Sequence, residues 1–420
     1  MSEIVIVGAG LAGLSAAKKI SSSGHDVHVI ERQNTVGGRV RTRQVDGFTL
    51  DRGFQVLFAN YPAARATLDY DALDLRKFSP GAIIAHAGAR SVIADPRRDP
   101  RSGLATLTNQ SVSSTDIIRA MKLWRHLRRR RLDDIFPGAD ESIESYLSDW
   151  GFSQSLINDF IRPFYGGITL DRSLSTGSAV FEYTAKMLMS GEIAVPAKGM
   201  AAIPEQLATS AQKAGATIST GTTVQDVQTI DDIVRVHTSE ETLEAEAAIV
   251  ATDPPTAREL TDIQAIPTTG KGCTTQYYSL PTSIDLRTKG RLLLNTTDDG
   301  PNHIAPMSIV APEYAPKGKQ LLAATYLGKQ PDNDKQLAEQ TEEALSSWYP
   351  EYNFNELSSI HTDRIDFAQF DQSPGSFQQL PNTDDPPGSI YLAGDYTRWS
   401  SIQGALESGM IAADAVLEKL

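Results

Sequence analysis

Three glycines near the start of the chain have the spacing of a phosphate-binding turn. Gly8, Gly10 and Gly13 follow the apolar residues 3–7 in the order G-x-G-x-x-G. The first glycine permits a tight turn, the second lets the backbone approach a pyrophosphate, and the third lets a helix pack closely on a sheet. The start of that helix, with Leu11 and Ala12, then faces the phosphate charge. The pattern predicts a dinucleotide site.

A carboxylate stands where such a site needs one. Glu31 ends the apolar run of residues 26–30 and lies 18 positions after Gly13. At a strand end it can accept hydrogen bonds from both hydroxyls of an adenosine ribose, and it repels a 2′-phosphate. The alternative is a glycine turn in a core that binds nothing. The acid, set between two strand-like runs, favours dinucleotide binding.

A second glycine pair distinguishes between the two common dinucleotides. Gly37, Gly38 and Arg39 follow Glu31 within eight positions. Recognition of a nicotinamide dinucleotide ends at the ribose acid. Here a further turn with a cation extends the site, which indicates a longer anionic cofactor, FAD.

The order G-x-G-x-x-G, then Glu31-Arg32, then Gly37-Gly38-Arg39 resembles the flavin amine oxidase superfamily. That superfamily includes amine oxidases, protoporphyrinogen oxidases and phytoene-type carotenoid desaturases. The resemblance implies that Glu31 and Arg32 hold the adenosine end of FAD, and that the G-G-R turn lies against its phosphates.

Later segments extend this resemblance to the C-terminus. "DGFTLDRGFQVL" (46–57) resembles a strand and turn beside the isoalloxazine ring, and "VPAKGMAAIPEQLA" (195–208) resembles the family's lysine-glycine-methionine segment. "YLAGDYTRWSSIQGALESG" (391–409) resembles the flavin-binding end, with a helix from about residue 403 whose N-terminus points at the flavin pyrimidine. The remaining cofactor residues that the resemblance implies are Gly53, Phe54, Val224, Gly394, Asp395, Ile402 and Gln403, with Gln55 in the substrate cavity beside the ring.

The matched segments predict an α/β protein with a discontinuous Rossmann-type FAD-binding domain of the glutathione-reductase-like, amine oxidase type. A second α+β domain of helices and a mixed sheet is expected to hold the substrate. The predicted cofactor segments are 1–60, 195–262 and 359–420, and the predicted substrate segments are 61–194, mostly helical, and 263–358.

Four residues are candidates for the substrate side of the flavin. Phe164 and Tyr165 lie beside a proline and paired glycines in "IRPFYGGITL", and either could line the cavity or pack in the core. Trp399 has the same two alternatives. Many amine oxidases place a lysine near flavin N5, and Lys271 is the nearest match by resemblance, with a surface loop lysine as the alternative. Lys271 and Trp399 are the candidate catalytic residues.

The C-terminal segment also departs from the monoamine oxidase pattern. In "WSSIQGA" an isoleucine, Ile402, stands where the resemblance leads us to expect an aromatic residue, so an aromatic cage facing the flavin would be incomplete. "YLAGDYT" is more similar to carotene desaturases. Cys273, the only cysteine, is far from the position where some members attach FAD, so the cofactor is expected to be non-covalent.

Residues 123–132, "LWRHLRRRRL", place five arginines on one predicted helix. Apolar residues recur at helical spacing before and within it: Ile117, Ala120, Met121, Trp124 and Leu127. A basic amphipathic helix on a membrane surface is one interpretation. A stripe that faces the core beneath a solvated arginine face is the other, and the sequence alone favours it.

Composition excludes several classes of function. The 420 residues carry 39 basic and 52 acidic side chains, a formal charge of −13, which offers no field to attract nucleic acid. The seven histidines show no metal-ligand spacing, so no metal site is expected. A strand-like run begins almost at once and no apolar run reaches about 18 residues, so we expect a cytoplasmic protein.

The sequence therefore predicts an FAD-dependent oxidoreductase that dehydrogenates a small, apolar or tetrapyrrole-like substrate, as a carotenoid desaturase or a protoporphyrinogen oxidase does. Hydride transfer to flavin N5 is the expected chemistry, with oxygen, a quinone or another compound as electron acceptor. Two alternatives stay open at this point: an amine oxidase that releases hydrogen peroxide, and a non-catalytic escort protein on the same fold.

Overall fold

A five-stranded parallel sheet forms the first half of the computed structural model, which describes residues 4–95, 97–107, 109–330 and 333–420. The strand order is β10-β2-β1-β14-β20, and every neighbouring pair is parallel. The strands are β1 (Ile4–Val7), β2 (Val27–Glu31), β10 (Thr217–Thr220), β14 (Ala247–Val250) and β20 (Ile390–Leu392). Three stretches far apart in the chain thus build one sheet.

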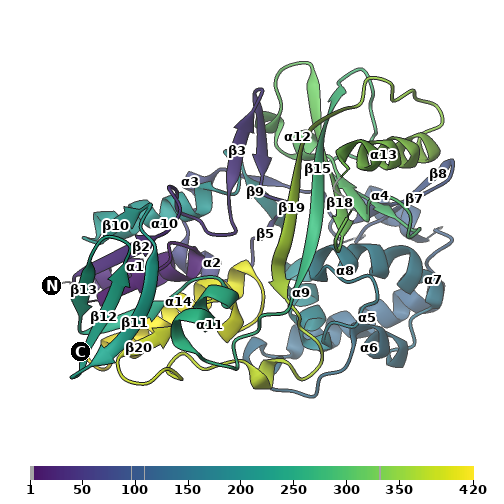
Figure 1. Cartoon of the computed structure of the whole chain (residues 1–420). Coiled ribbons are helices and arrows are strands. Elements are labelled where there is room, and N and C mark those ends of the chain that lie inside the picture. Colours follow the sequence, from purple (N-terminus) through teal and green to yellow (C-terminus); the bar gives the residue numbers. More distant parts are fainter. Residues whose placement is uncertain (1–3, 96, 108, 331–332) are drawn as a thin grey trace.

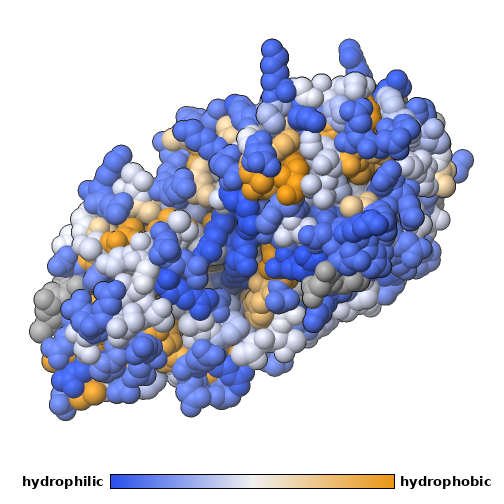
Figure 2. All heavy atoms as spheres, turned by 45° about the horizontal axis from the view of Figure 1, so that its top comes forward, coloured by the Kyte–Doolittle hydropathy of each residue, from blue (hydrophilic) through white to orange (hydrophobic). Residues whose placement is uncertain are grey.

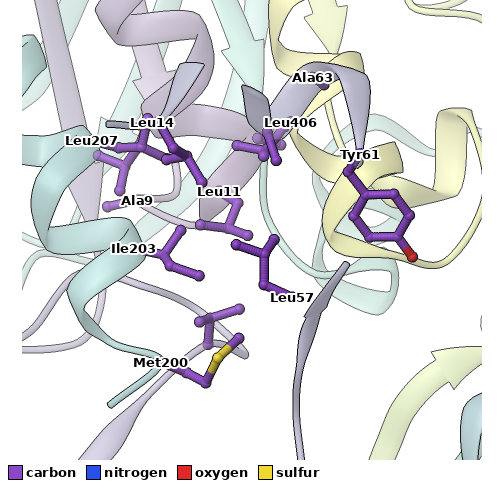
Figure 3. Packing of buried hydrophobic residues seen from close by; sticks show 14 of the residues in the cluster. Ala9, Leu11, Leu14, Leu57, Tyr61, Ala63, Met200, Ile203, Leu207 and Leu406 are labelled. Carbon is purple, nitrogen blue, oxygen red and sulfur yellow. The ribbon is translucent and has the colours of Figure 1, made fainter. Parts of the chain in front are cut away.

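Both faces of this sheet are covered, which is why β1 and β14 are apolar at every position. Three helices cover one face: α1 (Leu11–Ser22), α10 (Ala202–Lys213) and α14 (Ile402–Leu417). Figure 3 shows Leu11 and Leu14 of α1 close to Ile203 and Leu207 of α10. An antiparallel sheet of β11 (Val224–Ile230), β12 (Ile233–Thr238) and β13 (Thr242–Ala245) covers the other face.

Two glycines permit the close packing of α1. A Cβ at Gly13 would overlap the carbonyl oxygen of Gly8, and a Cβ at Gly409 of α14 would overlap the carbonyl oxygen of Ala12. The helix can therefore lie directly over the turn that precedes it, with α14 pressed against its backbone. This contact fixes the N-terminus of α1 at the edge of the sheet.

A seven-stranded mixed sheet forms the second half (Figure 1). Its order is β19-β15-β18-β17-β16-β7-β8, and among these pairs only β16 and β7 are parallel. The strands are β7 (Ala82–His86), β8 (Ala89–Ile93), β15 (Gly270–Pro281), β16 (Leu292–Asn295), β17 (His303–Ala305), β18 (Lys319–Leu327) and β19 (Ser358–Phe370).

Helices pack on both faces of this sheet. One face carries α13 (Asp334–Trp348), and Leu337, Leu345 and Trp348 are buried in that contact. The other face carries a helical layer of α5 (Ser114–Arg129), α6 (Ile143–Asp149), α7 (Gln154–Leu156), α8 (Arg162–Thr169) and α9 (Ser178–Ser190), with a π-helical turn, Ile157–Ile161, before α8. All five of these helices lie within residues 61–194.

Short elements complete the fold. They comprise a sheet of β5 (Leu57–Phe58), β9 (Ile193–Pro196) and β6 (Leu75–Lys77), the hairpin β3 (Thr42–Val45) and β4 (Phe48–Asp51), and the helices α2 (Pro62–Thr67), α3 (Tyr70–Leu73), α4 (Pro100–Leu107), α11 (Pro254–Thr261) and α12 (Met307–Val310). Single 3-10 turns lie at Leu132–Asp134, Pro312–Tyr314, Phe377–Gln379 and Asp395–Thr397.

Two predicted boundaries fall inside strands. The boundary between residues 194 and 195 lies within β9, which pairs with β5 and β6. The third cofactor segment was expected to begin at residue 359, but β19 runs to Phe370 and pairs with β15 of the seven-stranded sheet. A boundary within a strand would break its ladder of hydrogen bonds. We keep the five-segment division as a proposal, with the third cofactor segment starting after β19.

Within the described residues, no helix has both the length and the apolar character needed to cross a bilayer. On the face shown in Figure 2, hydrophobic residues form small patches separated by hydrophilic ones. The same described residues contain no group of three or more histidine, cysteine or carboxylate side chains that could hold a metal ion.

Candidate cofactor and substrate site

The glycine turn after β1 opens onto a large cavity. Gly8 has a positive φ of 106°, and a Cβ there would lie 2.7 Å from the carbonyl oxygen of Ala251. Gly10 is the N-cap of α1 and has no side chain to cap the helix. A Cβ at Gly10 would meet no atom within 4 Å, because it would project into empty space. The free N–H groups at this helix end are thus available to an anion.

Glu31 secures the same turn. Its side chain is only 6% exposed, yet it lines the cavity. Oε2 accepts a hydrogen bond from the backbone N–H of Ala9 (2.8 Å), and Oε1 accepts one from Gln33 (2.9 Å). Each carboxylate oxygen keeps a further lone pair for a ligand hydroxyl. The neighbouring Arg32 lies on the cavity wall and pairs with Asp253 (3.1 Å).

The second glycine turn lies directly against the first. The N–H of Gly37 donates to the carbonyl of Ala9 (2.8 Å), and a Cβ at Gly38 would lie 3.3 Å from the Cα of Gly10. Both glycines have positive φ, at 119° and 59°. The sequence motif therefore corresponds to two adjacent turns that form one cradle, with Arg39 at its far side.

Arg39 joins this cradle to the C-terminal segment. Its guanidinium donates to Oδ1 of Asp395 (2.6 Å) and to the carbonyl of Ala368 (3.1 Å). Burial disfavours the charge, but the Asp395 carboxylate outweighs that effect and raises the pKa of Arg39. Oδ2 of Asp395 accepts from the hydroxyl of Ser400 (2.8 Å). Two motifs separated by more than 350 residues thus meet at one ion pair.

The N-terminus of α14 also reaches the cavity. Ser401 caps the helix by accepting a hydrogen bond from the N–H of Gly404 (2.8 Å), and Ile402 lines the cavity wall. Gln403 does not belong to that wall. Its side chain is turned away and accepts from the N–H of Ala63 (2.9 Å) in the core, so any contact between Gln403 and a cofactor would involve its backbone.

The remaining predicted cofactor residues either line the cavity or pack beneath it. Leu11, Ala12, Gly53, Phe54, Val224 and Gly394 line the cavity, whereas Gly13 packs beneath the turn. Gln55 lines the cavity and donates to the carbonyls of Arg39 (3.0 Å) and Arg52 (3.2 Å). Its Oε1 is buried and has no partner among the described residues.

These residues fit FAD. Gly10 borders open space where a pyrophosphate can approach the backbone, the Arg39 cation lies beside the two glycine turns, and a carboxylate with spare lone pairs lies at the end of β2. The cavity has a volume of about 1470 Å³. That exceeds the range of roughly 300–1,000 Å³ for single-ligand pockets and leaves room for a second molecule.

The cavity has a second arm, between the seven-stranded sheet and the helical layer. Its wall is mainly apolar and aromatic, with side chains from α5, α8, α9, β16 and β17. Phe164 and Tyr165 both belong to it: Phe164 stacks on Phe160 (ring centroids 5.4 Å apart), and Tyr165 is buried with its hydroxyl near Thr184. They are cavity-wall residues that also pack against the helical layer.

An aromatic cluster stands between the two arms. Trp399 and Tyr61 both line the cavity, with ring centroids 6.0 Å apart and planes at 81°. Tyr183 and Phe136 back Trp399 at 4.9 and 5.5 Å. The Trp399 Nε1–H is buried without a partner among the described residues. Figure 3 shows the Tyr61 ring set apart from the aliphatic cluster. Tyr61 has no sequence motif that would have revealed it.

His303 is a further cavity residue that the sequence analysis missed. It is 2% exposed, lies on β17 and contacts the Phe54 ring (centroids 5.0 Å apart). Burial lowers the pKa of His303 to about 4, so the imidazole is neutral at neutral pH. Its Nε2 is buried and, within the described residues, has no hydrogen-bond partner. A buried polar group in that condition is costly unless a ligand satisfies it.

A chain of hydrogen bonds fixes which ring nitrogen of His303 carries the proton. Oδ1 of Asn302 accepts from Arg172 (3.2 Å), and Nδ2 of Asn302 donates to the carbonyl of Pro163 (2.9 Å). The amide NH₂ therefore faces Nδ1 of His303 (3.0 Å), which must accept. The proton is then on Nε2, which leaves a buried neutral N–H donor on a residue of the cavity wall, without a partner among the described residues.

Lys271 lies elsewhere. Its ammonium pairs with Asp171 and Asp371, both at 3.2 Å, and it is not part of the cavity wall. Indeed, no lysine in the described part of the chain lines the cavity. The two carboxylates hold this side chain at the start of β15, beside the α8–α9 connection. The expected position near flavin N5 is therefore corrected, and we assign Lys271 no catalytic role.

The sequence model of the family described as flavin containing amine oxidoreductase matches residues 11–417. Among solved structures, a protein provisionally named protoporphyrinogen oxidase from Exiguobacterium sp. 255-15 is similar, with a TM-score of 0.75, 16% identity and 99% of each chain covered. Cyclohexylamine oxidase from Brevibacterium oxydans IH-35A gives a TM-score of 0.69 at 16% identity, with 100% of this chain and 99% of that chain covered. At such identity these likenesses concern the fold.

A curated relative matches a shorter segment. A 4,4'-diapophytoene desaturase of Staphylococcus aureus (strain Newman) is 49% identical over 51 residues, which is 12% of this chain and 10% of the relative. The alignment therefore spans about a tenth of that protein's length.

Proposed function

The chain belongs to the flavin containing amine oxidoreductase family, and from this membership we propose that it dehydrogenates a predominantly apolar substrate that carries one hydrogen-bond acceptor. It is an FAD-dependent oxidoreductase. The observation that carries the proposal is the continuity of the cavity from the two glycine turns into an arm walled by apolar and aromatic side chains. Bound FAD supplies the acceptor for the hydride that leaves the substrate.

Charge in the second arm supports an uncharged substrate body. Of the carboxylates that line the cavity at its α5 end, Asp95 pairs with Arg97, and Asp116 accepts hydrogen bonds from Ser113 and Ser153. Neither offers a free negative charge to an ammonium group. The mainly apolar wall of the arm would bury apolar surface of a ligand, which is the main source of affinity for an apolar substrate.

His303 supplies the polar contact in this account. Because it is neutral with the proton on Nε2, it donates one hydrogen bond to a carbonyl, hydroxyl or nitrogen acceptor of the substrate and adds no charge. Trp399 and Tyr61 line the cavity on the path that the reacting carbon takes to the cofactor cradle. These residues orient the substrate. Packing against them directs the C–H bond that breaks toward the cofactor.

An amine oxidase is the second candidate, and the Tyr61–Trp399 pair is the observation that favours it. Two aromatic rings at a large mutual angle on the cavity wall can contact an amine, and a neutral His303 would not repel it. The wall lacks a free carboxylate for an ammonium group at the α5 end, so we place this function second. The escort alternative is set aside by the family assignment and the intact cradle.

Products distinguish the two candidates. The FAD-loaded protein is incubated in turn with three kinds of compound, with an artificial quinone acceptor present. These are an acyclic isoprenoid polyene precursor that carries a hydroxyl or carbonyl group, in detergent, a porphyrinogen, and a set of aliphatic amines. We expect the polyene or the porphyrinogen to lose two hydrogens by mass, and we expect no turnover of amines. Hydrogen peroxide release with amines alone would overturn the proposal in favour of the second candidate.

A further inference from the structure

Helix α5 forms part of the cavity wall at the end of the second arm. Its residues there are Asp116, Ile117, Ala120, Met121, Leu123, Trp124 and Arg125. Only Asp116, Leu123 and Leu127 of the helix are buried. Most of the apolar stripe that the sequence placed in the core thus faces the cavity instead. The helix lies in the helical layer, on the side of the molecule away from β1 and β2 (Figure 1).

The outer face of α5 exposes large apolar side chains. Ile118 is 50% exposed and Met121 is 58% exposed, and the two are three residues apart, so they lie side by side on one face. Only two other large hydrophobic residues of the described chain are comparably exposed, Ile309 and Leu420. Met121 belongs to both surfaces, since it also lines the cavity. The cavity wall therefore continues into an exposed apolar patch.

Positive charge surrounds that patch. Arg119, Lys122, Arg125, Arg128 and Arg129 are the basic residues of α5, and its single acid, Asp116, is buried and hydrogen-bonded to serines. In the ranges that the structure describes, Lys122, Arg125, Arg128 and Arg129 form no ion pair. The patch is thus strongly cationic in a chain whose formal charge is −13.

Two arginines extend this surface along the cavity. Arg97 and Arg98 both line it, and the Arg97 guanidinium lies 4.6 Å from the centre of the Trp124 ring. Arg128 lies over the same ring at 5.3 Å. Trp124 therefore contacts two cations, one of them from α5 itself, next to the end of the cavity.

We propose that the outer face of α5 docks on an anionic lipid bilayer, with Ile118 and Met121 entering the headgroup boundary and the surrounding cations on lipid phosphates. Exposed apolar side chains flanked by flexible cations, with no exposed acid between them on the helix, suit a fluid anionic surface. The inference rests on the proposed function in one respect: the cavity then opens into the bilayer, so an apolar substrate passes into the second arm without crossing water.

Vesicle binding tests this docking without any substrate. The FAD-loaded full chain is sedimented with vesicles of phosphatidylcholine containing phosphatidylglycerol, and with pure phosphatidylcholine. We expect the protein to pellet with the anionic vesicles, to be released by salt, and to stay in solution with the neutral ones. In Ile118→Glu/Met121→Glu and in Arg125→Glu/Arg129→Glu, partitioning should fall at least about tenfold, given the contribution of each cation and each buried apolar group.

Matched controls carry the same changes elsewhere on the surface. Ile309→Glu removes another exposed apolar side chain, and Lys213→Glu/Lys317→Glu reverses two other exposed cations. Both should bind anionic vesicles as the wild type does. Bound flavin absorbance and an unchanged melting temperature verify that every variant is folded.

The two proposals can fail separately. No pelleting with anionic vesicles, or pelleting that the α5 variants leave unchanged, would overturn the docking. If α5-dependent pelleting occurs while no apolar substrate is dehydrogenated in detergent, the proposed function fails and the docking stands.

Discussion

At the scale of single residues, His303 links the fold to the proposed substrate contact. Its tautomer depends on Asn302, which in turn is held by Arg172 and by the carbonyl of Pro163. Gly167 leaves the space that the ring occupies, since a Cβ there would lie 3.0 Å from Nδ1 of His303. Three parts of the chain thus orient one N–H group.

Replacing His303 should change substrate binding and leave the cofactor in place. His303→Phe keeps a ring of similar size but removes the donor, so we expect KM to rise about 5- to 10-fold, the equivalent of one hydrogen bond. His303→Gln places an amide N–H near the same position and should restore much of the loss. Steady-state kinetics with the flavin spectrum as control measures this. Equal KM values for wild type and His303→Phe would contradict the role.

A second residue-scale prediction concerns Asp51 beneath the cradle. Its carboxylate accepts hydrogen bonds from the hydroxyl of Thr42 (2.6 Å), the N–H of Met200 (2.7 Å) and the hydroxyl of Tyr314 (3.2 Å). Burial nevertheless outweighs these bonds and raises the pKa of Asp51 from 3.8 to about 6. The folded protein therefore binds this proton more tightly than the unfolded chain does.

Because the folded protein binds this proton more tightly, protonation of Asp51 stabilises the fold, and the stabilisation depends on pH. A folded pKa above the unfolded value means that the contribution of Asp51 to stability is present below about pH 4 and is lost as pH rises to about 6. The loss amounts to about 3 kcal/mol, from roughly two pKa units. Denaturant unfolding of the wild type and Asp51→Asn at pH 4 and pH 7 measures the difference. A difference in unfolding free energy between the two proteins that stays constant with pH would refute it.

At the scale of elements, two glycines of the β1–α1 turn have different roles, one in cofactor binding and one in folding. Gly10 and Gly13 belong to the same motif, but a Cβ at Gly10 meets open space, and a Cβ at Gly13 meets the Gly8 carbonyl. The motif therefore contains one glycine for the ligand and one for the fold.

Alanine at each position should reveal this division. Gly10→Ala should fold with an unchanged melting temperature as apoprotein but bind FAD at least about tenfold more weakly, because the methyl group pushes phosphate away from charge-assisted hydrogen bonds. Gly13→Ala should lower the unfolding free energy by about 1–3 kcal/mol through overpacking. Calorimetry of the apoproteins and FAD titration measure both. Unchanged FAD affinity in Gly10→Ala would count against the cradle.

Some elements could be placed from the sequence and others could not. The strand-turn-helix order around Gly10 and the C-terminal Asp395 follow local patterns, so their places in the fold could be predicted. The pairing of β19 with β15 could not, because it depends on contacts between strands some ninety residues apart. Lys271 shows the same limit: its two carboxylate partners come from other segments, and they take it away from the cavity.

At the scale of the whole molecule, one continuous cavity extends from the glycine turns at the five-stranded sheet to the space between the seven-stranded sheet and the helical layer. The sequence predicted the cofactor arm through motifs that repeat a known spacing. It predicted the second arm only as a region, since no motif marks His303, Tyr61 or the cavity side of α5. Apolar residues in a helix look alike whether they face a core or a cavity, and only the packed structure separates the two.

Anaerobic reduction of the bound flavin tests the central claim most directly. The FAD-loaded protein is titrated without oxygen with an acyclic isoprenoid polyene precursor that carries a hydroxyl or carbonyl group, with a porphyrinogen and with aliphatic amines, and the flavin absorption band is followed. We predict that the polyene or the porphyrinogen bleaches the band, one equivalent per flavin, and that amines leave it unchanged. Bleaching by amines alone would contradict the account and assign the second arm to amine oxidation.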